Sequence, residues 1–356
     1  MRILHSADWH LDAPFAGRSP EETERLRQAL LLVPGKIADI CREKQCDMVL
    51  LSGDLFDGAY SRESCRNLYD ALARMAVPVF IAPGNHDFCG PDSPWLRESW
   101  PANVHIFTNE KLESVGLPAL DCRVYGAGYQ SMDCPGLLEH FSAEGEERFQ
   151  IGVLHADPTQ RTTPYCPLTA EQIRQSGLDY LALGHIHKGG SFRAGKTLCA
   201  WPGCPMGRGY DETGEKGILL VELGETVETE FVPLRLPCFY DLQTDAGKDP
   251  AAAVARLLPP AGSNDYYRIT LTGYADQVDI VQLCVKFGNY PHLQLRDKTV
   301  PVTDLWGTAG EDSLEGLYFG MLRSVADGQD ETARRQALLA AQISRQILDG
   351  QEVKLP

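Results

Sequence analysis

Residues 77–87 read VPVFIAPGNHD, a short apolar run that ends in a turn and three polar side chains. The run at 77–82 is branched, aromatic and flanked by Pro and Gly, a pattern typical of a buried strand. Open α/β sheets place their chemistry at the carboxyl ends of such strands. Asn85 offers an oxygen ligand, His86 a titratable nitrogen, and Asp87 a carboxylate that can orient the histidine. Taken alone, the segment fits an ordinary polar turn equally well.

Four more predicted strands end in the same way. The strands at 2–7, 47–52, 149–154 and 178–183 run respectively into Asp8-x-His10, Gly-Asp54-x-x-Asp57, His155 and Gly-His185-x-His187. Apolar residues recur at near-helical spacing over 21–41, where Pro34 interrupts the pattern, and over 61–75. This alternation predicts βαβ units and a layered α/β core.

The residues at these five strand ends are nitrogen and oxygen ligands without a thiolate. Such a set suits a pair of divalent cations, Mn²⁺ or Fe²⁺, with Zn²⁺ as a further option. Each motif is weak by itself, since a lone His-x-His is more often structural than ligating. Because all five follow apolar strands, together they favour a dinuclear metal site over coincidence.

The composition is that of a globular protein, with 43% apolar and 23% charged residues among 356. Eleven dispersed cysteines form no Cys-x-x-Cys, which indicates reduced thiols and a cytoplasmic location. The apolar run at the N-terminus is too short for a signal peptide, because charged residues interrupt it. No apolar run in the sequence approaches the roughly 20 residues that cross a membrane.

The net charge of −16 argues against a protein that coats nucleic acid on its own. One stretch, 155–209, departs from this balance, with six basic and three acidic side chains. It either forms a binding surface beside the strand ends or reflects chance scatter. The basic residues are Arg161, Arg174, Lys188, Arg193, Lys196 and Arg208.

Pro233, Pro237 and a change of pattern predict a domain boundary. We expect a large domain at 1–235, a small α/β module at 236–310 and a helical segment at 311–356. Apolar residues between 314 and 325 share one helix face. This face either packs against the small module or docks a partner, and the sequence leaves both open.

The order of the five motifs resembles that of the calcineurin-like metallophosphoesterase superfamily. Within it, HSADWHLDAPF at 5–15, PGCP at 202–205 and ETGEKG at 212–217 are similar to the SbcD-type DNA repair exonucleases. The resemblance covers about 1–235. It implies a four-layer α/β/β/α sandwich, a small C-terminal α/β capping domain and terminal helices.

The resemblance also implies roles for the site residues. One metal would be held by Asp8, His10, Asp54 and His187, and the other by Asp54, Asn85, His155 and His185. Asp54 would bridge the two cations, which lower the pKa of a shared water to give a hydroxide nucleophile. His86 would act on the scissile phosphate. Asp57 and Asp87 would orient ligands, although turn and cap roles fit them equally. The remaining histidines, His5, His105, His140 and His292, are expected to be structural.

The implied function is a metal-dependent DNA exonuclease or endonuclease of DNA repair, with no membrane association. A coiled-coil, SMC-like ATPase subunit is the implied partner, and helices at 61–75 and 94–100 could form a homodimer. The alternative is a phosphodiesterase or phosphatase for small nucleotides or phosphoproteins, which the acidic charge fits more easily. A scaffold without activity is disfavoured, since every ligand position is filled.

Overall fold

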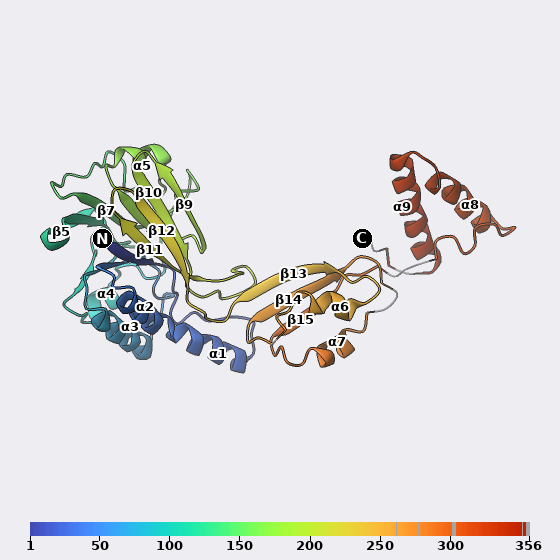
Figure 1. Ribbon diagram of the computed structural model, residues 1–356, viewed down its shortest axis with the longest axis horizontal. Helices are drawn as coiled ribbons and strands as arrows, with labels where there is room; N and C mark the ends of the chain where they lie inside the picture. Colours follow the sequence, from blue (N-terminus) through green and yellow to red (C-terminus); the bar gives the residue numbers. More distant parts are fainter. Residues whose placement is uncertain (261, 276–277, 301–303, 351, 354–356) are drawn as a thin grey trace. The chain divides into compact units, whose positions relative to one another are not determined.

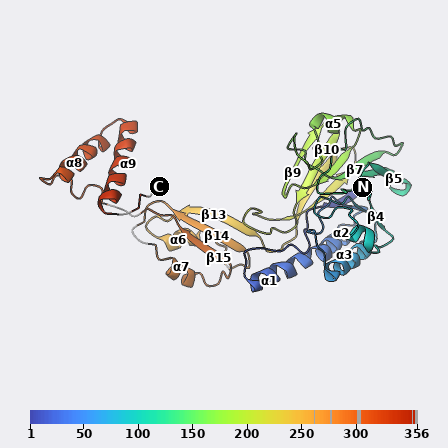
Figure 2. The same ribbon diagram turned by 180° about the vertical axis from the view of Figure 1, so that it is seen from behind.

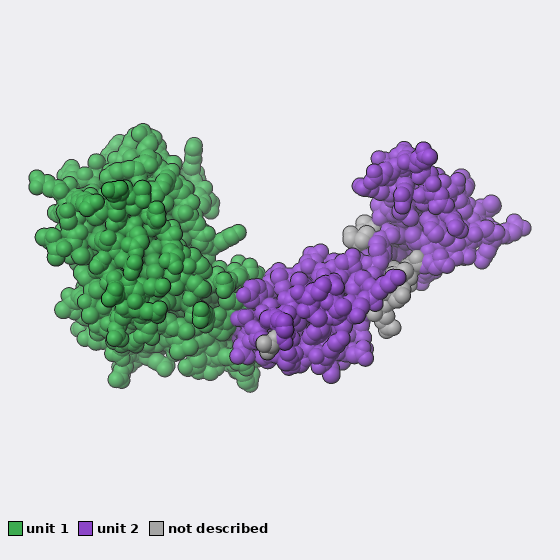
Figure 3. All heavy atoms as spheres, viewed as in Figure 1, with its two compact units in different colours: residues 1–239 green, residues 240–356 purple. Residues whose placement is uncertain are grey.

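The computed structural model describes residues 1–356 except 261, 276–277, 301–303, 351 and 354–356. Its contacts divide the chain into two units, Met1–Phe239 and Tyr240–Pro356, which Figure 3 colours separately. The separation of 236–310 from 311–356 stays a prediction. Among the described residues, no helix combines the length and the apolar character that a bilayer crossing needs.

The first unit contains two six-stranded sheets. The first sheet has the order β12-β11-β1-β2-β3-β4, with β1 to β4 parallel and β11 antiparallel to β1. Its strands are β1 (Arg2–Ser6), β2 (Met48–Leu51), β3 (Val79–Ile81), β4 (Val104–Ile106), β11 (Gly217–Leu223) and β12 (Val227–Pro233).

The second sheet has the order β5-β6-β7-β8-β10-β9, in which β6, β7, β8 and β10 are parallel. Its strands are β5 (Glu113–Leu117), β6 (Cys122–Gly126), β7 (Phe149–His155), β8 (Tyr180–Gly184), β9 (Lys188–Ala194) and β10 (Thr197–Gly203). Strand β5 was not expected from the sequence, because its side chains are half-buried or exposed and give no apolar run.

Helices cover the outer faces of both sheets. Helices α2 and α3 lie outside the first sheet, and α5 lies outside the second (Figures 1 and 2). Between the sheets, Leu50, Phe80, Val124, Ile151 and Tyr180 belong to one buried cluster. This arrangement confirms the four-layer α/β/β/α sandwich. The helices of this unit are α1 (Pro20–Leu31), α2 (Val33–Glu43), α3 (Arg62–Met75), α4 (Pro94–Arg97), the 3₁₀ helix η1 (Pro118–Leu120) and α5 (Ala170–Gln175).

Local signals explain where these elements begin. Ser61 caps α3 through a capping box with Ser64. Pro34 lies in the first turn of α2, where its missing N–H costs nothing, so the periodic stretch at 21–41 forms two helices. Strands β2 and β7 are buried along their whole length, as expected for parallel strands covered on both faces.

The second unit holds a three-stranded sheet of order β13-β14-β15 with α6 and α7, and a helical pair, α8 and α9. Val254, Ile269, Leu271, Leu283 and Phe287 belong to the core of the small module. The elements are β13 (Phe239–Asp245), α6 (Pro250–Ala255), β14 (Tyr266–Thr272), α7 (Ile280–Lys286), β15 (Leu293–Asp297), α8 (Leu314–Ala326) and α9 (Glu331–Leu348).

Candidate metal centre

The turns after β1 and β2 are tied together by their backbones. The Asp8 N–H donates to the Gly53 carbonyl at 3.0 Å, and the His10 N–H donates to the Asp54 carbonyl at 2.9 Å. Asp8, His10, Asp54 and His185 have positive φ angles of 56°, 49°, 52° and 89°. Non-glycine residues rarely adopt this region, and such strain concentrates at functional sites, where the surrounding structure enforces it.

Glycines make room for the side chains at this edge. A Cβ at Gly84 would lie 2.3 Å from Asp54 Oδ1, and one at Gly184 would lie 2.0 Å from the Ser52 carbonyl oxygen. Neither position tolerates a side chain without displacing these neighbours. The glycines of the sequence motifs therefore allow close approach between turns that are distant in the chain.

Six of the predicted site residues converge. Three overlapping groups have ligand atoms within 4.8 Å of one another in the described part of the chain. The groups are Asp8 with His10 and His187, His10 with Asp54 and His86, and Asp8 with Asp54 and His155.

Asn85 and His185 lie beside these groups. Asn85 Oδ1 is 3.0 Å from His155 Nε2. The His185 ring packs against the His155 ring with 5.3 Å between centroids, and its backbone N–H donates to Asp8 Oδ1 at 2.9 Å. The three groups do not include the His185 imidazole.

The donor set is arranged for a positive charge. The Nδ1 atoms of His10 and His187 face carboxylates, Asp57 at 2.9 Å and Glu212 at 2.6 Å. A carboxylate only accepts, so Nδ1 of His10 carries a proton and a neutral ring has its lone pair at Nε2. His187 Nδ1 also lies 3.1 Å from Arg208 Nη2, but its shorter contact with Glu212 favours the same tautomer. These two Nε2 atoms face each other at 3.2 Å. The two lone pairs repel each other, and a cation held between the two Nε2 atoms would remove this repulsion by accepting both as ligands.

Asp8 supplies a further sign of a cation site. Its Oδ2 atom is buried and has no hydrogen-bond partner among the described residues. A buried carboxylate oxygen left unpaired is costly, and a bound cation removes that cost. The residues present therefore fit divalent cations with nitrogen and oxygen ligands.

His155 and Asp54 show how strongly the centre favours positive charge. Burial opposes ionisation of both groups, yet their mutual attraction lowers the pKa of Asp54 and raises the pKa of His155 to about 9. His155 Nε2 lies 3.4 Å from Asp54 Oδ2, and its Nδ1 donates to the Ser52 carbonyl at 2.9 Å. The Nε2 atom of His155 is therefore the ring nitrogen that faces the cluster.

His86 differs from the buried histidines because its side chain is 41% exposed. Its Nδ1 lies 3.0 Å from Asp57 Oδ1, and this hydrogen bond is the main cause that raises the pKa of His86. Asp57 thus contacts both His10 and His86. Burial opposes ionisation of Asp57, but its hydrogen bonds to the two histidines outweigh burial and lower its pKa.

Asp87 stabilises the backbone of the turns around it through hydrogen bonds. Its carboxylate accepts hydrogen bonds from the N–H groups of Gly84 at 2.7 Å, Leu55 at 2.8 Å and Asp54 at 3.2 Å. Burial, followed by repulsion from Asp54, raises the pKa of Asp87 to about 7. Of its two expected roles, these contacts favour the turn-stabilising one.

Glu212 received no role from the sequence, and Arg208 appeared there only in the basic stretch, yet both contact the centre. Glu212 is buried and accepts from His187 Nδ1, from the Arg208 backbone N–H at 2.7 Å and from Arg208 Nη2 at 2.8 Å. Burial opposes its ionisation, but His187 and Arg208 together lower its pKa. Its place in an irregular segment gave no periodic signal. Only the motif ETGEKG, of which it is the first residue, pointed to it.

The four remaining histidines lie outside the centre. His5 is buried and fully bonded, with Nδ1 2.7 Å from the Tyr180 hydroxyl and Nε2 2.7 Å from Ser52 Oγ. His105 packs on Phe107 with 4.7 Å between ring centroids. His140 is exposed and His292 stacks on Tyr266.

The basic stretch at 155–209 does not present six unpaired cations. Arg174 pairs with Glu171, Lys196 with Asp179, and Arg208 with Glu212, while Arg193 donates to a backbone carbonyl. Local partners therefore satisfy four of these six side chains.

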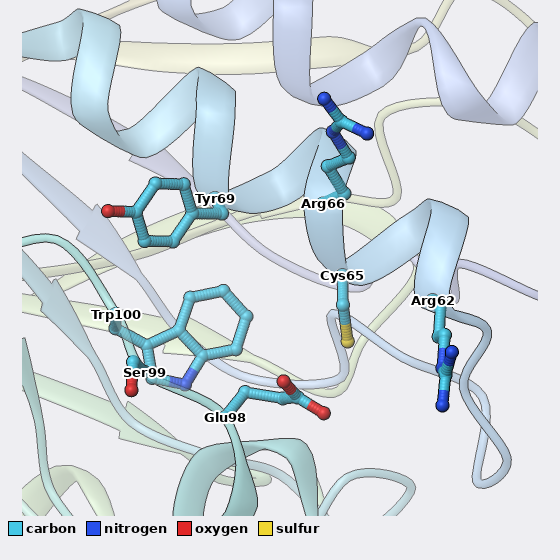
Figure 4. A pocket seen from close by; sticks show the side chains of 7 residues that line it. All are labelled: Arg62, Cys65, Arg66, Tyr69, Glu98, Ser99 and Trp100. Carbon is cyan, nitrogen blue, oxygen red and sulfur yellow. The ribbon is translucent and has the colours of Figure 1, made fainter.

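A surface pocket of about 430 Å³ lies between α3 and the segment after α4 (Figure 4). None of its lining residues is a predicted ligand. It lies on the helices for which a homodimer is predicted, and that homodimer stays a prediction. The pocket is lined by Arg62, Cys65, Arg66, Tyr69, Glu98, Ser99 and Trp100.

Comparison with known proteins identifies the family of the chain. The chain is 33% identical over 239 residues to the uncharacterized metallophosphoesterase YhaO of Bacillus subtilis (strain 168). This alignment covers 63% of this chain and 57% of YhaO. It is 24% identical over 266 residues to the SbcD component of the nuclease SbcCD of the same organism, covering 62% and 66%. The chain thus spans less than two thirds of the length of these curated relatives.

Among solved structures, a dimetal phosphatase from Danio rerio is 14% identical, with coverage of 66% of this chain and 96% of that chain and a TM-score of 0.44. The family model of the calcineurin-like phosphoesterases matches residues 1–189, the region that carries all the predicted ligands. The chain therefore belongs to the calcineurin-like phosphoesterase family.

Proposed function

We propose that this protein is a metal-dependent phosphodiester hydrolase that acts on DNA, as an exonuclease or endonuclease in DNA repair. The observation that carries the hydrolase is the convergence of Asp8, His10, Asp54, His155 and His187 in overlapping groups of potential ligands, together with the buried, unpartnered Oδ2 atom of Asp8. The similarity to the SbcD component of the nuclease SbcCD supports DNA as the substrate.

Calcineurin-like phosphoesterases use a dinuclear divalent metal site, and the converging residues form a candidate for it. One cation would be held by Asp8, His10, Asp54 and His187, and the other by Asp54, Asn85, His155 and His185. When bound, such a pair polarises a phosphate ester and lowers the pKa of water to near neutrality. Manganese is the metal that we propose.

The side chains around the centre have distinct roles in this proposal. Asp57 fixes His86 through Nδ1, so the opposite nitrogen can donate a proton to the leaving oxygen. Glu212 and Asp57 hold the rings of His187 and His10 with their Nε2 atoms toward the cluster. The Ser52 carbonyl does the same for His155.

The test is hydrolysis of double-stranded DNA with defined ends by the manganese-loaded chain. We expect release of nucleotides or cleavage near the ends, strongly reduced in a His86→Ala variant that still binds manganese. If neither the chain alone nor the chain with a coiled-coil ATPase partner cleaves DNA, the nuclease proposal is wrong.

A second candidate is a phosphodiesterase or phosphatase for small nucleotides or phosphoproteins. The net charge of −16 and the pairing of three of the six basic side chains with carboxylates favour it, because DNA binding needs unpaired cations. Turnover of a cyclic nucleotide or a phosphopeptide without DNA cleavage would select this alternative.

We propose that α8 carries the surface for a coiled-coil ATPase partner. Leu314, Leu317 and Met321 on this helix are 86%, 64% and 73% exposed. Contiguous exposed apolar side chains are typical of helix-docking surfaces. A partner bound there would supply the DNA affinity that the acidic chain lacks. We also propose a cytoplasmic location, based on the dispersed cysteines.

A further inference from the structure

A pocket of about 360 Å³ opens beside His86. We infer that it binds the nucleoside on the leaving-group side of the scissile phosphate, with the base against the Phe88 ring. This inference rests on the proposed phosphodiester hydrolysis. The walls of the pocket come from Gly58 and from His86, Asp87, Phe88, Pro91 and Pro94, among others.

The walls suit an uncharged, flat group better than a second phosphate. None of the nine residues that line the pocket is Lys or Arg. The Asp87 carboxylate is occupied by backbone N–H groups, and the Asp92 carboxylate pairs with Arg97. The remaining surface includes the rings of Phe88, Pro91 and Pro94, which offer apolar faces. Nucleobases stack on aromatic side chains with little dependence on their identity.

The Phe88 ring is held in place from behind. It is half-buried and packs against the core cluster on the outer face of the second sheet. A Cβ at Gly90 would lie 2.8 Å from Phe88 Cε2, so the Phe88 ring occupies space that a side chain at position 90 would otherwise take. The Gly90 N–H also donates to the Phe88 carbonyl at 2.7 Å. A fixed ring loses little freedom when a base stacks on it.

His86 connects the pocket with the metal centre. It lines the pocket, and one of its nitrogens lies within 4.8 Å of ligand atoms of His10 and Asp54. A phosphate at the centre would place its leaving oxygen near His86, and the group attached to that oxygen would enter the pocket. A volume of about 360 Å³ is at the small end of the range for ligand pockets, which fits one nucleoside.

The experiment combines a side-chain change with removal of a base. Phe88→Leu keeps the apolar volume but removes the aromatic face. Phe141→Leu, at another half-buried phenylalanine that packs against the same cluster, is the matched control. The substrates are dinucleotides that carry both bases, lack the base on the leaving side, or lack the base on the other side. Product analysis identifies the leaving nucleoside.

We expect Phe88→Leu to raise KM roughly tenfold for the complete dinucleotide, with kcat nearly unchanged. Removing the leaving-side base should cause a similar loss in the wild-type protein and little further loss in the variant. Phe141→Leu should behave as wild type. Equal effects of Phe88→Leu on all three substrates, or no effect of removing the leaving-side base, would overturn the inference.

Two further measurements separate this inference from the proposed function. Hydrolysis of bis(p-nitrophenyl) phosphate with manganese reports the metal centre, and its absence together with uncleaved dinucleotides means that the proposed function fails. Binding of a dinucleotide with a fluorescent aminopurine on the tested side needs no hydrolysis. Quenching in the wild-type protein that Phe88→Leu weakens supports the subsite, and absence of quenching in the wild-type protein refutes it.

Discussion

Replacing Glu212 with glutamine should weaken metal binding and leave the fold intact. The Glu212 carboxylate lies 2.6 Å from His187 Nδ1 and 2.8 Å from Arg208 Nη2, in a buried position. A carboxylate bonded to the far nitrogen of a histidine ligand fixes the tautomer and makes the ligating nitrogen more basic. The glutamine amide oxygen still accepts that hydrogen bond but carries no negative charge. His187 Nε2 should therefore become a weaker ligand.

Loss of such a partner typically reduces metal affinity by roughly 10–100-fold, which corresponds to about 1.4–2.7 kcal/mol. Calorimetric titration of metal-free protein with manganese measures this change directly. We expect one of the two binding events to weaken by that factor. The event that depends on His155 should change little, because the Ser52 carbonyl holds its ring instead.

Glu215 provides the control, since it lies in the same segment and is exposed. Glu215→Gln should bind manganese as the wild-type protein does. If Glu212→Gln binds both ions within twofold of wild type, the carboxylate does not tune His187 and our reasoning is wrong.

Four other outcomes follow from the same contacts. His86→Ala should retain its manganese, measured by elemental analysis, while kcat on a phosphodiester falls roughly 10²–10⁴-fold. Gly84→Ala should lose metal binding and melt at a lower temperature, because the new Cβ would lie 2.3 Å from Asp54 Oδ1. In the control Gly35→Ala, the new Cβ has no atom within 4 Å, so metal binding and melting temperature should stay as in the wild type. Manganese at 100 times its Kd should stabilise the protein by about 2.7 kcal/mol, and a chelator should reverse that shift in melting temperature. Folding lowers the pKa of Glu212 below its ordinary value of 4.5, so the ionised carboxylate stabilises the folded protein fully above pH 4.5 and loses this effect as the pH falls through the pKa of the folded state. The difference in unfolding free energy between the metal-free wild type and Glu212→Gln, measured in urea, should therefore shrink as the pH falls below 4.5.

The convergence of the candidate ligands at strand ends could be predicted because two independent regularities coincide there. An apolar run fixes where a strand lies, and parallel strands bring their carboxyl ends to one edge. Asp8 and Asp54 lie two and three residues after the ends of β1 and β2, and His155 is the last residue of β7, so the strands carry all three toward the centre. The turn geometry that supports them, with left-handed Asp8 and Asp54, leaves no such pattern.

Glu212 could not be placed by the same reasoning, because no strand carries it to the centre. It follows β10 by nine residues and precedes β11, in a segment whose course depends on tertiary contacts. Its partner Arg208 appeared in the sequence only as part of a basic surplus. The structure shows that this arginine fixes Glu212 through both its backbone N–H and its guanidinium. A charge count therefore could not show that Arg208 contacts a residue of the centre.

The strained turns also bear on how the centre works. Each non-glycine residue at positive φ costs on the order of 1–3 kcal/mol, and Asp8, His10, Asp54 and His185 all have this conformation. Only a rigid surrounding holds them there, and the buried strands of the two sheets supply it. Because the sheets impose this arrangement, the proposed cation would meet side chains that are already oriented, and little ordering would remain to oppose its binding.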